Sequence, residues 1–462
     1  MSNKWFRSSY RIAVLGGFQT GKTVFTTALL NHIKHHNKEL LKLGKTTNEG
    51  SIQLTFDEEL PLYGETSDVD RFPYEEYRNN ASKKWPKKTK ATAAYRCSFF
   101  RSDWPNTVGE LLVVDVPGER YADIPMATRS FKQWSQWLLE EVFAGKDNQQ
   151  LTEEYTKKTF VSGQPIDADS VLKAYKNTLV RLYQSYRPWV TPSTFLLKEN
   201  GDYHGVSVFS GDISQACCGL SEETQFAPLP KGVKKTDPVL YAQFEKAYGG
   251  YRTKLVMPLC SVLKSVNQVI VLVDLTSLLA GNTAMKNGHQ DLLKESLNML
   301  SPGFTLIGRL GQFLTTYLTG GHFDGSGIEK LAVVATKVDK VRQSDLKDDK
   351  PGTLLESMVS GIANRLKHKA SGLKVDYFSV AAAKSAFNVV GEPTKKRGVL
   401  EGTANEVVSN YLVPPLPDQW PASWKAGDYY FAEFMPGFPD NEQQCPGHIH
   451  MNTIINFLLD FS

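Results

Sequence analysis

The most restrictive feature of this 462-residue chain is a glycine-rich loop close to its N-terminus. An apolar, β-branched run ends at Leu15 and is followed by Gly16, four further residues and then Gly21, Lys22 and Thr23, which gives the pattern G-x-x-x-x-G-K-T. Glycines are needed in such a loop because backbone N–H groups must turn inward around phosphate oxygens with no side chain in the way. The strand-loop-helix context is the one that phosphate binding requires. The pattern predicts a nucleoside triphosphate site but does not choose the base.

Each position in this loop has an expected role. Lys22 would neutralise the β- and γ-phosphates, the Thr23 hydroxyl would ligate Mg²⁺, and the helix that begins near Gly21 would point its positive end at the phosphates. The residues expected to contact the nucleotide here are Gly16, Phe18, Gln19, Thr20, Gly21, Lys22, Thr23 and Val24.

A second apolar run, at 111–116, ends in the pattern D-x-x-G formed by Asp115 and Gly118. Its consecutive aliphatic residues indicate a strand that is covered on both faces, as in a sheet with helices on each side. Because ligands bind at the carboxyl ends of the strands in open α/β sheets, Asp115 is expected in the Mg²⁺ shell and the Gly118 N–H at the γ-phosphate. A simple strand-ending turn at Pro117 and Gly118 is the alternative explanation.

A third apolar run, at 331–335, is followed by Thr336, Lys337 and Asp339, and this segment is expected to select the base. A carboxylate at Asp339 can accept hydrogen bonds from both the guanine N1–H and the exocyclic amino group. Adenine offers no matching pair of donors and would leave the buried acid unpaired. Lys337 is expected to lay its alkyl stem over the ring. The alternative is a solvated Lys-Asp pair at the end of a surface strand.

A fourth run, at 375–380, is a further expected strand that leads into small residues. Small side chains let the backbone approach a ligand, and N–H groups placed here could reach the guanine O6. Ser379, Ala381 and Ala382 are the expected contacts, and the sequence leaves the register among the consecutive alanines at 381–383 open.

The ordered set of four motifs resembles the first, third, fourth and fifth motifs of Ras-type P-loop GTPases. The wider layout resembles that of one bacterial family, the YcjX-like stress-associated GTPases: LGGFQTGKT near the N-terminus, DVPGER, a long helical insertion, ATKVD, and a Pro/Trp-rich tail that ends in HIHMNTIINFLLDF. The resemblance covers nearly the whole chain. It implies a cytoplasmic protein that binds GTP and GDP with Mg²⁺, hydrolyses GTP and is linked to envelope or phage-shock-type stress.

We therefore expect a Ras-like α/β P-loop GTPase fold with a mostly parallel six-stranded sheet and a large helical insertion after the second switch. The strands are expected at 11–15, 93–100, 111–116, 269–274, 331–335 and 375–380, with 93–100 as the antiparallel one. The expected division is a first part of the G domain at 1–118, a mainly helical insertion at 119–265, a second part of the G domain at 266–395, and a C-terminal Pro/Trp-rich strap and helix at 396–462.

The insertion is expected to be helical because its apolar residues recur at helical spacing. Helices that face a core account for this pattern. Because the insertion begins at the second switch, its orientation should also respond to the γ-phosphate, which makes it the expected surface for an effector protein. The two apolar stripes are Phe131, Trp134, Leu138 and Val142, and Leu172, Tyr175, Leu179, Leu182 and Tyr186.

Two threonines qualify as the residue that covers the Mg²⁺ in the Ras-type pattern. Thr92 abuts the expected strand at 93–100 and is preferred, while Thr89 lies further back in a loop that could fold over the metal. The expected metal ligands are thus Thr23, Thr92 and Asp115. The expected catalytic residues are Lys22, Thr92, Gly118 and Glu119.

The sequence departs from the Ras pattern at three positions, one of which is Pro117 in place of a smaller residue. Glu119 stands where a glutamine usually orients the attacking water, and Thr336 stands where asparagine is commoner. A carboxylate can position water but adds charge beside a polyanion, so intrinsic turnover should be slow, at or below roughly 10⁻⁴ to 10⁻² s⁻¹. Two rival functions stay open: an ATP-dependent kinase or motor, and a nucleotide-bound adaptor without turnover. An arginine finger in cis could come from Arg71, Arg78, Arg120 or Arg129.

The amino-acid composition limits the classes of partner that the protein is expected to bind. The chain has 53 Lys and Arg residues against 49 Asp and Glu residues, a net charge of +4, which is too even for the concentrated positive field of a nucleic-acid binder. A run of five lysines within 83–90 is either a solvated loop or a contact for anionic lipid. No apolar run approaches the ~18–20 residues of a membrane span. We expect a cytoplasmic protein that could reach the inner membrane peripherally through the lysine run.

Overall fold

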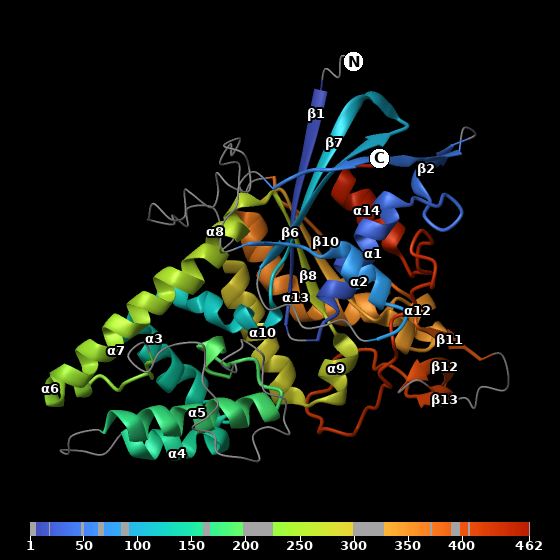
Figure 1. Ribbon diagram of the computed structural model, residues 1–462. Coiled ribbons are helices and arrows are strands. Elements are labelled where there is room, and N and C mark those ends of the chain that lie inside the picture. The colour runs from blue at the N-terminus through green and yellow to red at the C-terminus, as the bar shows by residue number, and fades with distance from the viewer. Residues whose placement is uncertain are drawn as a thin grey trace.

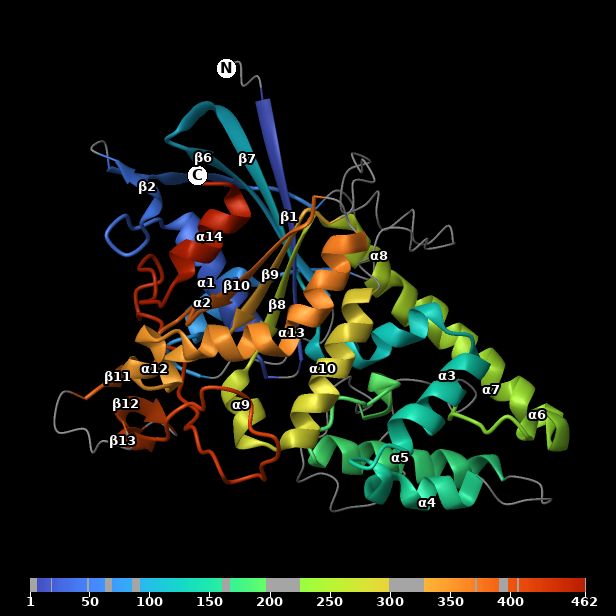
Figure 2. The ribbon, with the colours of Figure 1, turned by 180° about the vertical axis from the view of Figure 1, so that it is seen from behind.

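The computed structural model describes residues 6–17, 19–47, 50–62, 69–84, 92–159, 167–196, 225–298, 328–369, 372–389, 398–404 and 407–461. A twisted central sheet carries helices on both faces, and a group of helices extends away from one side of it (Figures 1 and 2). The protein is therefore a mixed α/β structure.

The central sheet has eight strands in the order β10-β9-β8-β1-β7-β6-β4, with β5 paired to β6. β10, β9, β8, β1 and β7 run parallel, β6 runs antiparallel to β7, and β4 runs antiparallel to β6. The parallel strands bring their carboxyl ends to one edge, where α/β sheets bind ligands. The strand bounds are β1 Phe6–Gly16, β4 Leu54–Glu59, β5 Asp70–Arg71, β6 Ala93–Arg101, β7 Trp104–Asp115, β8 Gln268–Val273, β9 Lys330–Ala335 and β10 Lys374–Ser379.

All six expected strands lie in this sheet, and β6 is antiparallel, as predicted. The predicted number of strands is wrong, because β4 and β5 extend the sheet beyond β6. β4 has the sequence LTFDEE and therefore lacks the apolar run that identified the other strands. Charged side chains are typical of edge strands, where they discourage pairing with other chains.

Helices surround the sheet and fill the described part of the segment between β7 and β8. Those near the sheet are α1 Lys22–Lys34, α2 Tyr74–Asn80, α9 Leu275–Ala280, α10 Thr283–Asn298, α12 Gln343–Lys347, α13 Lys350–Lys369 and α14 Met451–Leu459, with a 3₁₀ turn η8 at Val338–Lys340. Those between β7 and β8 are η1 Gly118–Thr128, α3 Phe131–Trp137, η2 Leu138–Phe143, α4 Gln149–Thr159, α5 Ala168–Gln184, η3 Ser193–Leu196, α6 Val233–Thr236, α7 Pro238–Tyr251, η7 Arg252–Val256 and α8 Met257–Ser265.

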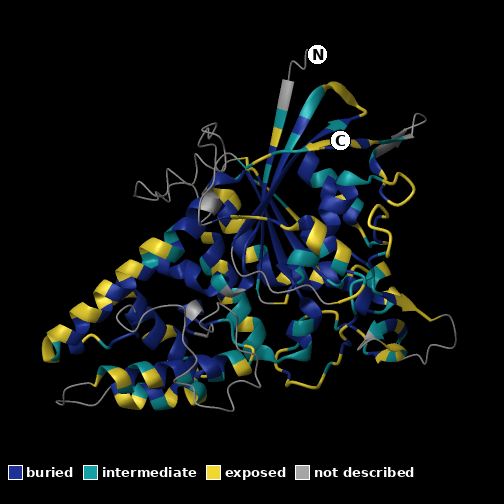
Figure 3. Ribbon diagram, in the orientation of Figure 1, coloured by how far each residue is buried: buried dark blue, intermediate teal, exposed yellow. Residues whose placement is uncertain are grey.

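Alternate residues of the central strands enter two apolar cores, one on each face of the sheet. In β1, Ile12 and Val14 belong to one core, while Ala13 and Leu15 belong to the other, as the two-residue period of a strand requires. The first core includes α1 and α14, and the second includes α10, α13 and the helices between β7 and β8. β8 and β9 are buried at each position, and Figure 3 shows this buried centre in dark blue.

The helices between β7 and β8 pack around aromatic side chains. Trp134 is fully buried, and its ring centroid lies 5.3 Å from that of Tyr248 and 5.5 Å from that of Phe226. The first predicted apolar stripe is buried throughout. In the second stripe, Tyr186 is 61% exposed, because it lies beyond the end of α5 and leaves the helix with a φ of +54°.

The C-terminal part forms a small sheet and then an extended segment. Strands β11 (Ala386–Asn388), β12 (Gly398–Ala404) and β13 (Val407–Val413) are antiparallel. Between positions 414 and 450 the chain has no helix and no strand apart from an isolated bridge at Ile449. It returns in this extended form to α14, which packs on the face of the sheet that also carries α1 (Figure 1).

Between α1 and β4, strands β2 (Leu43–Thr47) and β3 (Gly50–Ile52) pair as an antiparallel hairpin. Among the helices that the structure describes, none combines the length and the apolar character that crossing a membrane requires.

Candidate nucleotide site

The loop between β1 and α1 depends on glycine at two positions. Gly16 has a φ of +154°, and a Cβ there would lie 2.6 Å from Thr20 Oγ1 and 2.8 Å from the Leu272 carbonyl oxygen. Gly21 adopts a φ of +86° immediately before α1. The first turn of α1 has no side-chain cap and no acidic residue, so its N–H groups and the positive end of its dipole suit an anion.

Lys22 and Gly118 lie against this loop. The Lys22 side chain is buried, and its Nζ donates to the carbonyl oxygens of Gly16 at 3.0 Å and Gly17 at 2.8 Å. A Cβ at Gly118 would lie 2.4 Å from Lys22 Nζ and 2.6 Å from the Gly17 carbonyl oxygen. Any larger residue at position 118 would therefore push the two apart, which explains the glycine of the D-x-x-G pattern.

Oxygen groups suited to Mg²⁺ gather beside the loop. Asp115 is fully buried at the end of β7, and its Oδ2 accepts from the Thr23 hydroxyl at 3.4 Å. Thr92 immediately precedes β6, whose first residue, Ala93, pairs with Asp115. The carbonyl oxygen of Thr92 accepts a hydrogen bond from the Asp70 N–H at 2.9 Å. Hydroxyl and carboxylate oxygens are ligands that suit Mg²⁺, so the Thr23 and Asp115 pair fits the metal.

Other expected contacts of the phosphate region are placed only in part. Phe18, Thr89 and the side chain of Glu119 lie outside the described residues. Gln19 is exposed in a loop position with a φ of +59°, and Val24, in the first turn of α1, packs against a small apolar cluster that includes Ala28. The choice between the two candidate threonines for the Mg²⁺ stays open.

The end of β9 is tied to the glycine-rich loop. The Thr336 hydroxyl donates to the Thr20 carbonyl oxygen at 3.0 Å. Lys337 follows with a φ of +57°, and its Cε lies 3.9 Å from the position that a Cβ on Gly21 would take. Its Nζ forms an ion pair with Asp274 at 2.8 Å. The alkyl stem of Lys337 therefore runs over the loop, next to the place where a base bound by this edge would stack.

Asp339 is buried and held by the loop that follows β10. Its Oδ2 accepts from the Ser385 N–H at 2.7 Å, the Ser385 hydroxyl at 2.6 Å and the Ala386 N–H at 3.2 Å. All three donors reach the same oxygen, so they fix the orientation of the carboxylate. Sequence reasoning missed Ser385 and Ala386. The signal was the Ser-Ala pair at the start of β11, a hydroxyl followed by a small residue.

The residues that the sequence suggested for this loop have other partners. The Ser379 hydroxyl donates to Asp349 at 2.8 Å. The N–H of Ala381 donates to the Ile449 carbonyl oxygen at 3.1 Å, and Ile449 returns a bond of 2.9 Å. Ala382 packs beside the apolar core that includes α1. The described contacts to Asp339 come from Ser385 and Ala386, and an approach of Ser379, Ala381 and Ala382 to the guanine O6 stays a prediction.

Four charged side chains lie at the base side of the loop. Lys337 Nζ contacts Asp274 at 2.8 Å and Glu433 at 3.4 Å, and Lys340 Nζ contacts Glu433 at 2.6 Å. Burial alone would raise the pKa of Asp274, but Lys337 and Lys340 bring it well below its usual range. Burial alone would lower the pKa of Lys337, but Asp274 and Glu433 raise it. The opposite charges of Asp274 and Lys337 therefore stabilise each other.

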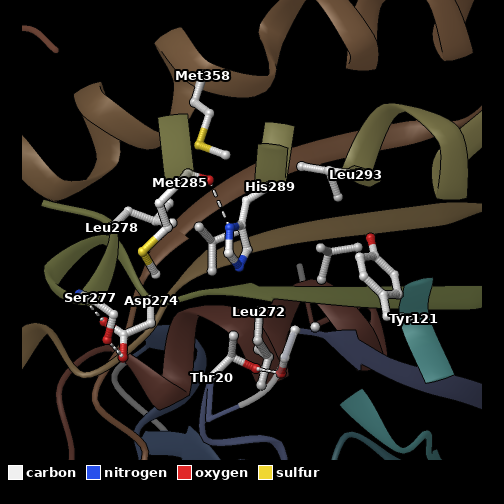
Figure 4. A pocket seen from close by; sticks show the side chains of 14 residues that line it. Thr20, Tyr121, Leu272, Asp274, Ser277, Leu278, Met285, His289, Leu293 and Met358 are labelled. Atoms are coloured by element: carbon white, nitrogen blue, oxygen red, sulfur yellow. Dashed lines mark hydrogen bonds between the residues drawn. The ribbon is translucent and has the colours of Figure 1, made fainter. Parts of the chain in front are cut away.

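A small cavity of about 50 Å³ adjoins Gly16, Gly17 and Thr20 of the loop, and Figure 4 shows the side chains that line it. His289 of α10 points into it, with Nδ1 bonded to the Met285 carbonyl oxygen at 2.8 Å and its ring 3.7 Å from the Cβ position of Gly17. Burial lowers the pKa of His289, which favours the neutral ring. The cavity is lined by Gly16, Gly17, Thr20, Tyr121, Val271, Leu272, Val273, Asp274, Ser277, Leu278, Met285, His289, Leu293 and Met358.

The segment after Gly118 is hydrogen-bonded to side chains of α7. The Tyr251 hydroxyl donates to the buried carboxylate of Asp123 at 2.6 Å. The Tyr248 hydroxyl donates to the carbonyl oxygens of Met126 at 3.2 Å and Arg129 at 2.7 Å. Burial raises the pKa of Asp123 even though hydroxyl groups donate to it. A movement at Gly118 would reach α7 through these contacts.

Three of the candidate arginine fingers have structural partners. Arg71 forms an ion pair with Glu59, and Arg129 forms one with Glu295 at 2.9 Å. Arg78 is 1% exposed and donates to three backbone carbonyl oxygens between positions 439 and 444. Burial and three backbone bonds hold Arg78 in place, whereas the Arg71 side chain is 71% exposed, and a finger role for Arg71, Arg120 or Arg129 stays a prediction.

The lysine run expected to contact a surface is described only at its beginning. Lys83 and Lys84 are exposed just after α2, and positions 85–90 lie outside the described residues. Contact with anionic lipid stays a prediction.

The comparison with known families finds a match over nearly the whole chain. A family model described as the YcjX-like family, DUF463, matches residues 10–461. The match runs from β1 to the end of α14, so it includes the glycine-rich loop, the helices between β7 and β8 and the C-terminal segment. It confirms the resemblance that the motifs suggested. This chain belongs to the YcjX-like family.

Proposed function

We propose that this protein is a guanine-nucleotide switch that binds GTP and GDP with Mg²⁺ and hydrolyses GTP slowly. The observation that carries the proposal is the position of Asp339. It is buried at the same sheet edge as the glycine-rich loop, its carboxylate is oriented by Ser385 and Ala386, and its neighbour Thr336 is bonded to the loop. An oriented, buried carboxylate next to a phosphate loop suits a base with two adjacent donors, which guanine has and adenine lacks.

The phosphate end supports the same proposal. Lys22 donates to carbonyl oxygens of its own loop, and the same ammonium group can turn to the β- and γ-phosphates when nucleotide enters. Thr23 and Asp115 would hold Mg²⁺ together with the phosphates, and a threonine before β6 would cover it. When bound, Mg²⁺ supplies positive charge to the phosphoryl oxygens.

Turnover would consist of attack by water on the γ-phosphorus, which releases GDP and phosphate. Glu119 follows Gly118 in the sequence, at the place where a glutamine orients this water in Ras-type GTPases. Its negative charge next to a polyanion favours slow hydrolysis. We infer that loss of the γ-phosphate moves Gly118, and that this movement is transmitted through η1 and the Tyr251–Asp123 hydrogen bond to α7. An effector protein bound to the inserted helices would then respond to the change. A role in envelope or phage-shock-type stress follows only from the family resemblance.

The test is a competition assay with Mg²⁺ present, in which GTP, GDP and ATP displace a fluorescent guanine nucleotide from the wild type and from Asp339→Ala. We expect displacement by GTP and GDP, little displacement by ATP, and weak binding by the variant. Asp376→Ala is a matched control, because Asp376 is an exposed carboxylate on β10 that contacts only the neighbouring backbone in the described contacts. Equal competition by ATP together with a silent Asp339→Ala would favour an ATP-dependent enzyme.

Phosphate release under single-turnover conditions then tests hydrolysis. Slow release that is lost in Lys22→Met supports the GTPase. Tight GTP binding with no phosphate release would favour the second candidate function, a nucleotide-bound adaptor. The observation that favours this alternative is Glu119, which stands where a glutamine usually orients the attacking water.

A further inference from the structure

The C-terminal part of the chain reaches the base side of the candidate site. Positions 431–450, here called the tail segment, pair with the loop after β10. The Lys384 N–H donates to the Gly447 carbonyl oxygen at 2.7 Å, and a Cβ at Gly437 would lie only 2.0 Å from the Lys384 carbonyl oxygen. The loop that presents Ser385 to Asp339 is therefore packed directly against the tail segment.

One side chain of the tail segment enters the charged group next to the loop. Glu433 pairs with Lys340 at 2.6 Å through one carboxylate oxygen and with Lys337 at 3.4 Å through the other. Its own side chain is 53% exposed, whereas that of Lys340 is 2% exposed. Glu433 thus approaches from the solvent side and supplies a negative charge to two lysines that lie deeper.

The position of Lys337 depends on this charge. Lys337 and Lys340 repel each other, and burial together with that repulsion lowers the pKa of Lys340. Asp274 pairs with Lys337 from the inner side, and Glu433 pairs with it from the outer side. Without Glu433, both lysines would compete for Asp274, and the head group of Lys337 would lose the contact that draws it outward.

The course of the Lys337 stem makes its head position important. Its Cε lies 3.9 Å from the Cβ position of Gly21, so the stem crosses the loop that would hold the phosphates. A base recognised by Asp339 would have to lie against this stem, because both residues belong to one short segment at the end of β9. Because Asp274 and Glu433 both pair with the Lys337 ammonium group, the alkyl stem is fixed in a position where it can stack against the base.

We propose that Glu433 is a positioning residue of the guanine-nucleotide site, which acts through Lys337, so that the tail segment determines how long nucleotide stays bound. This inference rests on the proposed function. It assigns to Glu433 a part in nucleotide retention, not in the choice of base, because Asp339 is oriented by Ser385 and Ala386 and not by Glu433.

The experiment measures dissociation of a fluorescent GDP analogue, with Mg²⁺ present and excess unlabelled GDP added, by stopped flow. We expect Glu433→Gln to release the analogue about 3- to 10-fold faster than the wild type, the range of a lost ion pair that is partly buried. The preference for GDP over ADP should stay unchanged. Glu401→Gln is the matched control, since Glu401 is an exposed glutamate on the neighbouring strand β12 and undergoes the same change of charge.

Two further variants separate positioning from general stabilisation. Glu433→Asp, which keeps the charge, should restore most of the wild-type dissociation rate. In Lys337→Met, which keeps an alkyl stem but has no charge, adding Glu433→Gln should change the rate less than twofold, because the residue through which Glu433 acts is no longer charged. Thermal melting of each variant without nucleotide shows whether it is folded.

The outcomes are distinguishable. If the wild type retains the analogue and Glu433→Gln releases it no faster, or if the acceleration persists in full in the Lys337→Met background, the inference on Glu433 is wrong while the guanine switch stands. If the wild type binds neither GDP nor GTP, the proposed function fails, and the inference fails with it.

Discussion

The phosphate side and the base side of the candidate site are built in different ways. On the phosphate side, Lys22 bonds to Gly16 and Gly17, which lie six and five positions away in sequence. On the base side, Thr336 reaches Thr20 across 316 positions, and Lys337 reaches Glu433 across 96. A local loop can be specified by its own residues, whereas the base side exists only once β9, the loop after β10 and the tail segment have come together.

This difference predicts separable effects. Changes on the phosphate side should reduce the affinity for all nucleotides alike, because each of them carries the same phosphates. Changes on the base side should alter discrimination, retention or the stability of the assembled segments. Four variants test the separation, from the largest expected effect to the smallest.

The largest effect is expected from Lys22→Met. The variant removes the one buried ammonium group of the loop, and charge-assisted hydrogen bonds to phosphate contribute enough that affinity for GTP and GDP should fall about 100-fold. The ratio of GTP to ATP affinity should not change. Fluorescence titration measures both, with Lys42→Met as the control on an exposed lysine. A comparable loss of base preference would show that the two sides are not separable.

Asp274→Asn should have the next largest effect, on stability. The amide can still cap α9 through the Ser277 N–H, but it leaves Lys337 and Lys340 without their inner carboxylate. The free energy of unfolding at pH 7 should fall by about 3 kcal/mol, the lower end of the cost of a broken buried pair. Urea unfolding without nucleotide measures it. Asp237→Asn, at the N-cap of α7 and without a lysine partner in the described contacts, should cost far less.

The pH dependence of this loss has a definite sign. Because Lys337 and Lys340 hold the pKa of Asp274 below its unfolded value despite burial, the stabilisation is complete above the ordinary aspartate pKa of about 4 and is lost as the pH falls toward the folded-state pKa. The difference between the wild type and Asp274→Asn should therefore be constant from pH 8 to about 5 and should shrink below that. A difference that grows on acidification would contradict the ion pairing.

Ser385→Ala tests which residues form the base-side loop. Loss of the hydroxyl that orients Asp339 should reduce the preference for GTP over ATP about 5- to 10-fold, while the two backbone donors remain. Competition titration gives the ratio. Ser379→Ala is the paired variant, because its hydroxyl donates to Asp349 instead. A loss of preference in Ser379→Ala but not in Ser385→Ala would return the site to the position that the sequence suggested.

The two sides also differ in how far the sequence could predict them. Gly16 and Gly21 are required by backbone geometry within one short loop, so the pattern alone located the loop between a strand and a helix. The six apolar strands were equally visible. β4 was not, because its acids match no apolar run, and its pairing with β6 is a tertiary contact.

The loop after β10 shows why the base side was harder. Nothing in the local sequence says that the backbone of Ala381 pairs with Ile449, or that Ser385 donates to Asp339, because both contacts join segments that are distant in the sequence. The role of Glu433 could not be predicted from the sequence either, because an exposed glutamate in an irregular segment belongs to no recognisable sequence pattern. Its role depends on which lysines the fold brings beside it.

Thr336→Val should have the smallest effect, and it tests the connection between the two sides. Valine matches the shape of threonine but cannot donate to the Thr20 carbonyl oxygen, so the loop and the end of β9 would lose one neutral hydrogen bond. Affinity for GDP should fall about threefold, at the scale of about 0.5–1.5 kcal/mol for such a bond, and Thr336→Ser should restore it. Calorimetric titration measures the change. A loss as large as that in Lys22→Met would mean that this single bond holds the loop in its binding shape, and that the two sides act as one unit.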